Sequence, residues 1–427
     1  MKNYKINTKC IQSGYEPKNG EARQLPIFQS TTYKYDSSEE MAQLFDLSKE
    51  GHMYTRISNP TVDAVEKKIA DLEGGIGAMC TSSGQAASLI SVLNIAQAGD
   101  NILSLATIYG GTTNLFSVTL KKMGIETRFI TLDMDEKDIK ELVDDRTRLF
   151  FSETIANPAL HVLDIEKYAK IAHSFKIPLF VDNTFATPIL CRPFEYGADI
   201  VIHSTTKYMD GHATVVGGVI VDSGNFDWNI DNKYPELSEP DESYHGVIYT
   251  EQFKNAAYIV KARTQLMRDL GSTPQPMTAF LLNLGLETLS LRIIRHSENA
   301  LAVAKHLKTK ANVEFVNYPG LESDSSYKKA QKYLYKGFSS GVVSFGIKGG
   351  REAAQIFMDS LKLAKIVVHV ADARTSVLHP ASTTHRQLTD EQLVNCGIKA
   401  NFIRLSVGIE DIDDIIEDID QALTKVK

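Results

Sequence analysis

The most regular feature of the chain is a series of short apolar runs between about residues 61 and 255. Seven of them predict strands, at 77–82, 101–106, 127–132, 148–153, 178–183, 198–204 and 216–221. The stretches between them have the spacing of amphipathic helices. Because apolar residues fill these runs instead of alternating with polar ones, the strands are expected to be buried on both faces. We therefore predict an α/β fold with a mostly parallel seven-stranded sheet covered by helices.

The pattern differs on both sides of this region. Residues 1–60 show little periodicity and many polar and aromatic side chains, which predicts an arm that contacts a neighbouring subunit. After a helix-rich stretch, apolar runs at 313–320, 341–350, 364–370 and 401–411 predict a smaller α+β domain. We thus expect three parts: an N-terminal arm over 1–60, a large domain over 61–255 and a C-terminal α+β domain over 256–427.

Composition and charge are those of an ordinary globular protein, with 43% hydrophobic and 23% charged residues among 427. The formal net charge of −7 provides no basic field for nucleic acid or an anionic membrane. The four cysteines form neither a Cys-x-x-Cys pair nor a metal-like Cys/His spacing, which favours a reducing compartment. The N-terminus lacks the apolar segment of a signal peptide, and apolar stretches such as 86–98 look too short and polar to span a bilayer. We expect a cytoplasmic protein.

Polar side chains gather where three of the predicted strands end. They are Glu153 and Asn157, Asp182, and Ser204, Thr206 and Lys207. The carboxyl ends of parallel strands lie at one edge of a sheet, where open α/β sheets bind ligands. A lysine at the end of a buried strand must either reach solvent or stay desolvated. Lys207 is therefore a candidate for chemistry at this edge.

A phosphate site is predicted before these strands. The stretch TSSGQAA, residues 81–87, indicates a strand end, a turn and a helix start, where the free N–H groups of Gly84 and Gln85 form a phosphate cradle. A phosphate cradle, Asp182 and a desolvated Lys207 at one edge together suit pyridoxal 5′-phosphate. The lysine amine would bind the aldehyde, and the aspartate would keep the ring nitrogen protonated. Tyr109, after the strand at 101–106, offers a face for the ring to stack on.

Each of these residues alone has an ordinary explanation. Lys207 would be a solvated surface residue, Asp182 a turn or cap residue, and Arg404 an ion-paired surface arginine. Residues 204–207 also match the Ser-x-x-Lys signature of penicillin-recognising acylases, with Ser204 as nucleophile, but the sequence lacks the Ser-Asp-Asn and Lys-Thr-Gly elements of that class. A non-enzymatic relative that keeps the fold is another alternative. The combination of residues in this order favours a cofactor-dependent enzyme.

Six stretches in this order also carry a resemblance to a known family. They read YTRISNPT, TSSGQAA, VDNTFATP, HSTTKY, HPASTTH and RLSVGIED. Together they resemble the cystathionine γ-synthase and methionine γ-lyase family, the Cys/Met metabolism enzymes that use pyridoxal phosphate, from about residue 8 to 425. The resemblance implies a type I aminotransferase-like fold in which the large domain binds the cofactor. It also implies a homotetramer built from dimers that share active sites.

The resemblance implies a role for each site residue. Lys207 would hold the cofactor covalently, Asp182 would face the pyridine nitrogen and Tyr109 would stack on the ring, which makes these three the catalytic residues. The other cofactor contacts would come from Gly84, Gln85, Ser204, Thr206 and Asn157 of one chain, and from Tyr54 and Arg56 of the neighbouring chain. Arg404, with Asn157 beside it, would bind the substrate carboxylate.

Within the family, the details favour the O-acetylhomoserine sulfhydrylase branch. Gly111 stands where the γ-lyases usually carry a cysteine linked to elimination, and Gln85 and the added stretch 232–246 resemble the sulfhydrylases. His369 and Ala371 depart from the family's Ser/Asn-Leu-Gly-Asp stretch. The branch implies that sulfide or methanethiol replaces the acetate of O-acetyl-L-homoserine, giving homocysteine or methionine in methionine biosynthesis. Methionine γ-lyase and cystathionine γ-synthase remain alternatives, and the acyl group and the preferred thiol stay open.

Overall fold

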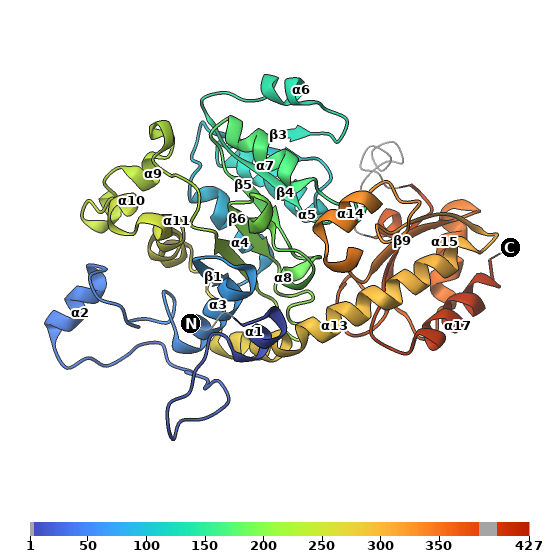
Figure 1. Cartoon of the computed structure of the whole chain (residues 1–427), viewed down its shortest axis with the longest axis horizontal. Coiled ribbons are helices and arrows are strands. Elements are labelled where there is room, and N and C mark those ends of the chain that lie inside the picture. Colours follow the sequence, from blue (N-terminus) through green and yellow to red (C-terminus); the bar gives the residue numbers. More distant parts are fainter. Residues whose placement is uncertain (1–3, 384–398, 427) are drawn as a thin grey trace.

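The computed structural model describes residues 4–383 and 399–426, and its largest element is a seven-stranded sheet (Figure 1). The strands are β1 (Gly77–Thr81), β2 (Asn101–Leu105), β3 (Glu126–Ile130), β4 (Thr147–Glu153), β5 (Leu179–Asp182), β6 (Ile200–His203) and β7 (Gly218–Asp222). Their order is β1-β7-β6-β5-β4-β2-β3. All pairs from β6 to β3 are parallel, whereas β7 is antiparallel to both β1 and β6. The predicted mostly parallel sheet is confirmed.

Helices cover this sheet, so that β2, β4, β6 and β7 are buried along their whole length. This is why apolar residues fill these strands instead of alternating. Helix α3 packs on β1 and β7, α4 on β6 and β7, and α7 on β5. The helices of this region are α3 (Pro60–Glu73), α4 (Gly84–Leu93), α5 (Gly110–Asn114), α6 (Glu136–Glu141), α7 (Ile165–Ser174), α8 (Thr187–Leu190), α9 (Pro235–Ser238), α10 (Tyr249–Gln252), α11 (Ala257–Lys261) and α12 (Arg268–Leu270).

A smaller, mostly antiparallel sheet lies beyond it in the order β10-β11-β12-β9-β8. Its strands are β8 (Val313–Asn317), β9 (Val342–Ile347), β10 (Lys365–Ile366), β11 (Ser376–Leu378) and β12 (Phe402–Ser406), with helices α14 (Tyr327–Tyr333), α15 (Gly350–Ser360) and α17 (Ile412–Leu423). Of the apolar run 364–370, only β10 forms a strand. The Val367 N–H still donates to the Val377 carbonyl of β11 at 3.3 Å, whereas Val368 is 70% exposed.

Helix α13 (Pro276–Lys308) joins the two regions (Figure 1). Leu286 and Ile293 belong to the core of the large sheet, whereas Val303 and Leu307 belong to the core of the small one. By length and composition alone α13 could cross a membrane, so the expectation that no stretch is long enough was wrong for this helix. Half of its most apolar window is buried inside the protein, however, as in the core helix of a globular protein.

The segment before α3 carries α1 (Ile6–Gln12) and α2 (Ser38–Phe45). Helix α1 packs against α3 and α13 and buries Cys10, whereas the chain around α2 extends away from the body (Figure 1). Phe28, Phe45 and Tyr54 are 45%, 56% and 44% exposed. Aromatic side chains exposed on an extended segment suit contact with another molecule. That this arm contacts a neighbouring subunit, and that the chain divides into the three parts named above, remain predictions.

Candidate active site

The residues predicted at the strand ends meet at the carboxyl edge of the large sheet. Asp182 ends β5 and pairs with Ile202 of β6, directly before the turn that carries Ser204 and Lys207. The Ser204 N–H donates to Thr184 Oγ1 at 2.8 Å, and the Thr184 N–H donates to Asp182 Oδ1 at 2.9 Å. Thr184 thus connects Asp182 to Ser204. The sequence reasoning missed Thr184, although a residue two positions after a strand-end aspartate is the usual donor of an Asx turn.

The start of α4 forms a cradle against Ser204. The Ser83 hydroxyl caps the helix by accepting the Ala86 N–H at 3.1 Å. The N–H groups of Gly84 and Gln85 lie in the first turn, where an α-helix offers no partner. A Cβ at Gly84 would lie 2.7 Å from Ser204 Cβ and 2.9 Å from Ser204 Cα, so only glycine permits this close approach. Free donors pointing at the space beside a helix start suit a phosphate.

The hydroxyl groups of Ser204 and Thr206 differ in their hydrogen bonds. The Thr206 hydroxyl donates to the Gly217 carbonyl at 3.1 Å and accepts the Gly217 N–H at 3.0 Å. The Ser204 hydroxyl has no hydrogen-bond partner within 4–383 and 399–426. Ser204 is therefore free to donate to a phosphate. Thr206 can donate only after its hydroxyl turns away from Gly217.

Lys207, in the same turn as Ser204, is half-buried. Burial, and then the nearby Arg404 guanidinium, lowers the pKa of Lys207 to about 8, while Asp372 opposes the shift. Its Nζ lies 3.5 Å from Nδ1 of His369. An amine with such a pKa is partly unprotonated near neutral pH and can act as a nucleophile.

Asp182 ends β5 at this edge, and its carboxyl is desolvated. Burial raises its pKa, whereas the hydrogen bond from Thr184 lowers it. Oδ1 accepts the Thr184 N–H at 2.9 Å, and the Thr184 side chain also hydrogen-bonds to this carboxyl. A cation placed against this carboxyl would favour the ionised form. The protonated ring nitrogen of a pyridine is such a cation.

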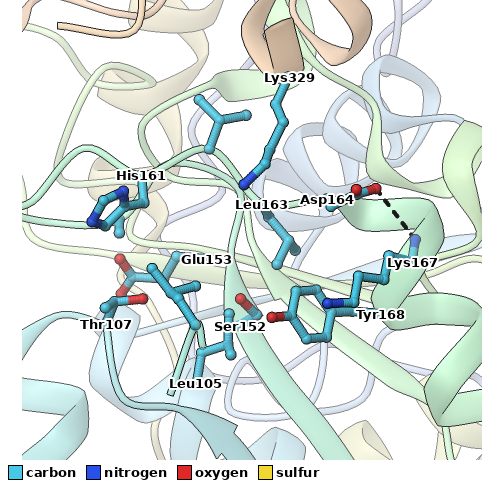
Figure 2. Close-up of a pocket in the computed structure, with 13 residues that line it drawn as sticks. Leu105, Thr107, Ser152, Glu153, His161, Leu163, Asp164, Lys167, Tyr168 and Lys329 are labelled. Atoms are coloured by element: carbon cyan, nitrogen blue, oxygen red, sulfur yellow. Dashed lines mark hydrogen bonds between the residues drawn. The ribbon is translucent and has the colours of Figure 1, made fainter. Parts of the chain in front are cut away.

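Glu153, which the sequence placed at this edge without a role, holds two neighbours. Its Oε1 accepts the Tyr109 N–H at 2.7 Å and its Oε2 accepts the Asn157 N–H at 3.2 Å. Burial, and then the charge of Asp182, raises the pKa of Glu153 well above its usual range. Figure 2 shows Glu153 beside Thr107 and His161 in the wall of a cavity of about 150 Å³. Of the side chains predicted at this edge, Glu153 is among the described residues that line this cavity, whereas Asp182, Lys207 and Arg404 are not.

Tyr109 follows β2 and precedes α5, with its side chain 47% exposed. A Cβ at Gly111 would lie 2.5 Å from Tyr109 Cε1, and the φ of Gly111 is not in the left-handed region. The closeness of the ring therefore favours glycine at position 111. The Gln85 side chain donates to Thr112 Oγ1 at 3.1 Å and so ties α4 to α5. Stacking of Tyr109 on a cofactor ring remains a prediction.

Arg404 on β12 reaches this edge from the small sheet. Its Nη1 donates to Asn157 Oδ1 at 3.1 Å and its Nη2 to the Val368 carbonyl at 3.3 Å. Its Nε is buried without a partner, and burial lowers the pKa of Arg404 to about 10. The reading of Arg404 as an ion-paired surface residue is wrong, because Arg404 is buried and has no acidic partner among the described residues. A buried guanidinium with an unused N–H suits a carboxylate ligand.

Two predicted residues lie apart from the others. The Arg56 guanidinium lies over the Tyr54 ring, 5.3 Å from its centroid, and donates to the carbonyl of Arg268. In the described part of the chain, neither forms a hydrogen bond or ion pair with another predicted site residue. Both side chains are exposed. A single chain does not use them at this edge, and their role in a neighbouring subunit remains a prediction.

These side chains fit pyridoxal 5′-phosphate. The helix start at Gly84 and Gln85 would hold the phosphate together with Ser204. Asp182 would face the ring nitrogen, and Lys207 would take the aldehyde. In the described part of the chain the Ser204 hydroxyl has no hydrogen-bond partner, and this free donor and the lowered pKa of Lys207 both suit the cofactor.

Comparison with known proteins agrees with this fit. The family model described as "Cys/Met metabolism PLP-dependent enzyme" matches residues 7–424. The chain is 43% identical to O-acetyl-L-homoserine sulfhydrylase of Leptospira meyeri, over 100% of this chain and 98% of that protein. It is 47% identical to homocysteine synthase of Schizosaccharomyces pombe, over 98% of both. A solved Campylobacter jejuni structure, described as an O-acetylhomoserine (thiol)-lyase with N'-pyridoxyl-lysine-5'-monophosphate, matches with a TM-score of 0.95 at 37% identity, over 99% of this chain and 100% of that chain.

Proposed function

Because the chain belongs to the Cys/Met metabolism PLP-dependent enzymes, we propose that it is an O-acetyl-L-homoserine sulfhydrylase. In this proposal, sulfide or methanethiol replaces the acetate of O-acetyl-L-homoserine, and the products are homocysteine or methionine. The observation that carries it is the Lys207 amine, whose pKa is lowered to about 8 and which lies close to the buried Arg404. The similarity to named sulfhydrylases over the full chain supports the choice of substrate.

The chemistry of the proposal divides between cofactor and protein. Bound pyridoxal phosphate supplies an electron sink for the substrate carbons. Lys207 Nζ takes up and returns protons at those carbons, and its four-carbon stem gives it the reach to do so. Asp182 keeps the proton on the ring nitrogen. Arg404 binds the substrate carboxylate and so orients the reacting carbons toward Lys207.

The proposal includes a cytoplasmic homotetramer, a dimer of dimers that share active sites, with no nucleic-acid or membrane partner. The exposed aromatic residues of the arm support the shared sites, because Tyr54 and Arg56 find no use at the active site of their own chain. The net charge of −7 supports the absence of a nucleic-acid partner and of binding to an anionic membrane. The relatives are metabolic enzymes by name, which agrees with small-molecule substrates as the main partners.

A substrate comparison tests the proposal. With sulfide, O-acetyl-L-homoserine should react about tenfold or more faster than O-succinylhomoserine, O-phosphohomoserine or O-acetylserine. Homocysteine should be the main product and α-ketobutyrate a minor one, because Gly111 leaves room beside Tyr109 for an incoming nucleophile. L-Methionine alone should be a poor substrate. Release of α-ketobutyrate from L-methionine as fast as sulfhydrylation would instead assign a γ-lyase.

Gly111→Cys is the matched variant for this product ratio. A side chain at position 111 displaces the Tyr109 ring, since its Cβ would lie 2.5 Å from Cε1. The share of α-ketobutyrate should therefore rise in the variant. An unchanged product ratio would show that position 111 does not control the choice between replacement and elimination.

A mixing experiment tests the shared site. Arg56→Ala and Lys207→Ala chains, each nearly inactive alone, should regain up to about a quarter of the wild-type activity when randomly co-assembled, because one site of each mixed dimer is intact. The control mixes Lys207→Ala with Asp182→Asn. Both of these residues lie on the same sheet edge of one chain, so no intact site arises. No recovery in the first mixture, with mixed oligomers demonstrated by mass spectrometry, would place each site within a single chain.

A further inference from the structure

The loop between β10 and β11 brings an imidazole to the reactive lysine. His369 Nδ1 lies 3.5 Å from Lys207 Nζ, at a position where the sequence departs from the family pattern. The loop is held in place two residues later. Ala371 has a φ of +72°, in the left-handed region that favours glycine, and its N–H donates to Ser406 Oγ at 2.8 Å. The loop thus keeps a glycine-like backbone at Ala371 and carries, two residues earlier, the His369 side chain that contacts Lys207.

The contact assigns a tautomer to the imidazole ring while Lys207 is protonated. A protonated amine has only donors, so the Nδ1 that faces it accepts and the ring proton is assigned to Nε2. Nε2 is buried without a hydrogen-bond partner in the described part of the chain. It lies 3.9 Å from Asp372 Oδ2, which is too long for a hydrogen bond but close enough for the carboxylate to orient the N–H.

Charged groups face the His369 ring from three elements. Lys207 and Asp210 belong to the connection after β6, Asp372 to the loop of His369 itself, and Arg404 to β12. Burial, then the two cations, lowers the pKa of His369, and the two carboxylates oppose this shift. The ring is therefore neutral at the pH at which Lys207 titrates, and its Nδ1 lone pair is available.

We propose that His369 is a positioning residue for Lys207, with Nδ1 accepting a hydrogen bond from Nζ and Asp372 orienting the ring. His369 holds the Lys207 amine at the edge of the sheet by accepting one of its N–H groups. Asp372 keeps the imidazole in the orientation that presents Nδ1 to that amine. The inference rests on the proposed function only in that Lys207 is the reacting amine, and it holds for any ester or thiol.

The test measures Lys207 in the cofactor-free full-length protein. Competitive labelling with acetic anhydride, from about pH 6 to pH 10 and quantified by mass spectrometry, gives the apparent pKa of Lys207. His369→Leu should move this pKa about 1 pH unit lower, because the buried ammonium loses its acceptor. His369→Asn should keep it near the wild-type value, because its amide oxygen takes the place of Nδ1.

His369→Gln is the matched control, since it carries the same amide one bond farther from the backbone, and it should behave like His369→Leu. It also replaces the leucine variant if circular dichroism shows that variant to be misfolded. In the cofactor-loaded enzyme, kcat should fall by about tenfold in the leucine and glutamine variants with KM unchanged, and recover in part in His369→Asn. A folded leucine variant that labels like the wild type, or an asparagine variant that behaves like leucine, would overturn the proposal. A failure of the ester comparison would leave this labelling result unaffected.

Discussion

Lys207→Ala should lower turnover by at least about 10⁴-fold while leaving the protein folded, because the substitution removes the only group proposed to move protons at the substrate. The backbone bonds of this turn do not depend on the side chain. The Lys207 N–H donates to the Ser204 carbonyl at 3.2 Å, and the Gly211 N–H donates to the Lys207 carbonyl at 2.8 Å. The phosphate cradle and Asp182 also remain. The variant is therefore expected to keep its circular dichroism spectrum and to bind cofactor without a covalent link.

Borohydride reduction separates this loss from a loss of binding. Reduction should attach the cofactor permanently to the wild-type peptide that contains Lys207 and should attach none to the variant. Lys261→Met is the matched control. Lys261 is also buried with a pKa lowered to about 8, but its Nζ donates to the Asn94 carbonyl at 3.2 Å, away from the predicted site residues. The control should keep covalent attachment and turnover. Activity of Lys207→Ala within tenfold of the wild type would refute the assignment of Lys207.

The large sheet was predictable because its strands are buried on both faces. Strands such as β4 and β6 appear in the sequence as uninterrupted apolar runs, and all seven predicted runs correspond to strands. The small sheet was less predictable. Strand β11 has three residues, too few for a pattern. Val367 and Val368 continue an apolar run although they are exposed, because a sequence does not reveal where an edge strand ends.

The site was predictable where it depends on sheet topology. Asp182 and Lys207 follow neighbouring parallel strands, so their meeting at one edge follows from the strand order. The contact between Lys207 and His369 joins positions 162 residues apart and depends on how the small sheet lies against the large one. The sequence marked His369 only as a departure from a pattern. Arg56 differs again, since its proposed partners belong to a second chain.

Asp182 and Glu153 lie at the same edge, but replacing each carboxyl with the matching amide is expected to have different effects. The pKa of Glu153 is raised well above its usual range by burial and by the charge of Asp182, so Asp182 is the group that keeps the charge. Glu153→Gln is therefore expected to remove less charge than Asp182→Asn. It disturbs mainly the contacts with the Tyr109 and Asn157 N–H groups, and a loss of turnover of about tenfold is expected.

Asp182→Asn should lower kcat by roughly 10²-fold or more, because it removes the charge that keeps the ring nitrogen protonated in a site where charges are poorly screened. Asparagine keeps Oδ1, which accepts the Thr184 N–H at 2.9 Å, so the turn that carries Ser204 should persist. Thermal unfolding should therefore change little, while the pH dependence of the bound cofactor's absorbance should change. Equal losses in Asp182→Asn and Glu153→Gln would mean that the hydrogen bonds of these two side chains, and not the charge of Asp182 beside the ring, account for the loss. Near-normal activity of Asp182→Asn would leave Asp182 with the structural role of holding Thr184.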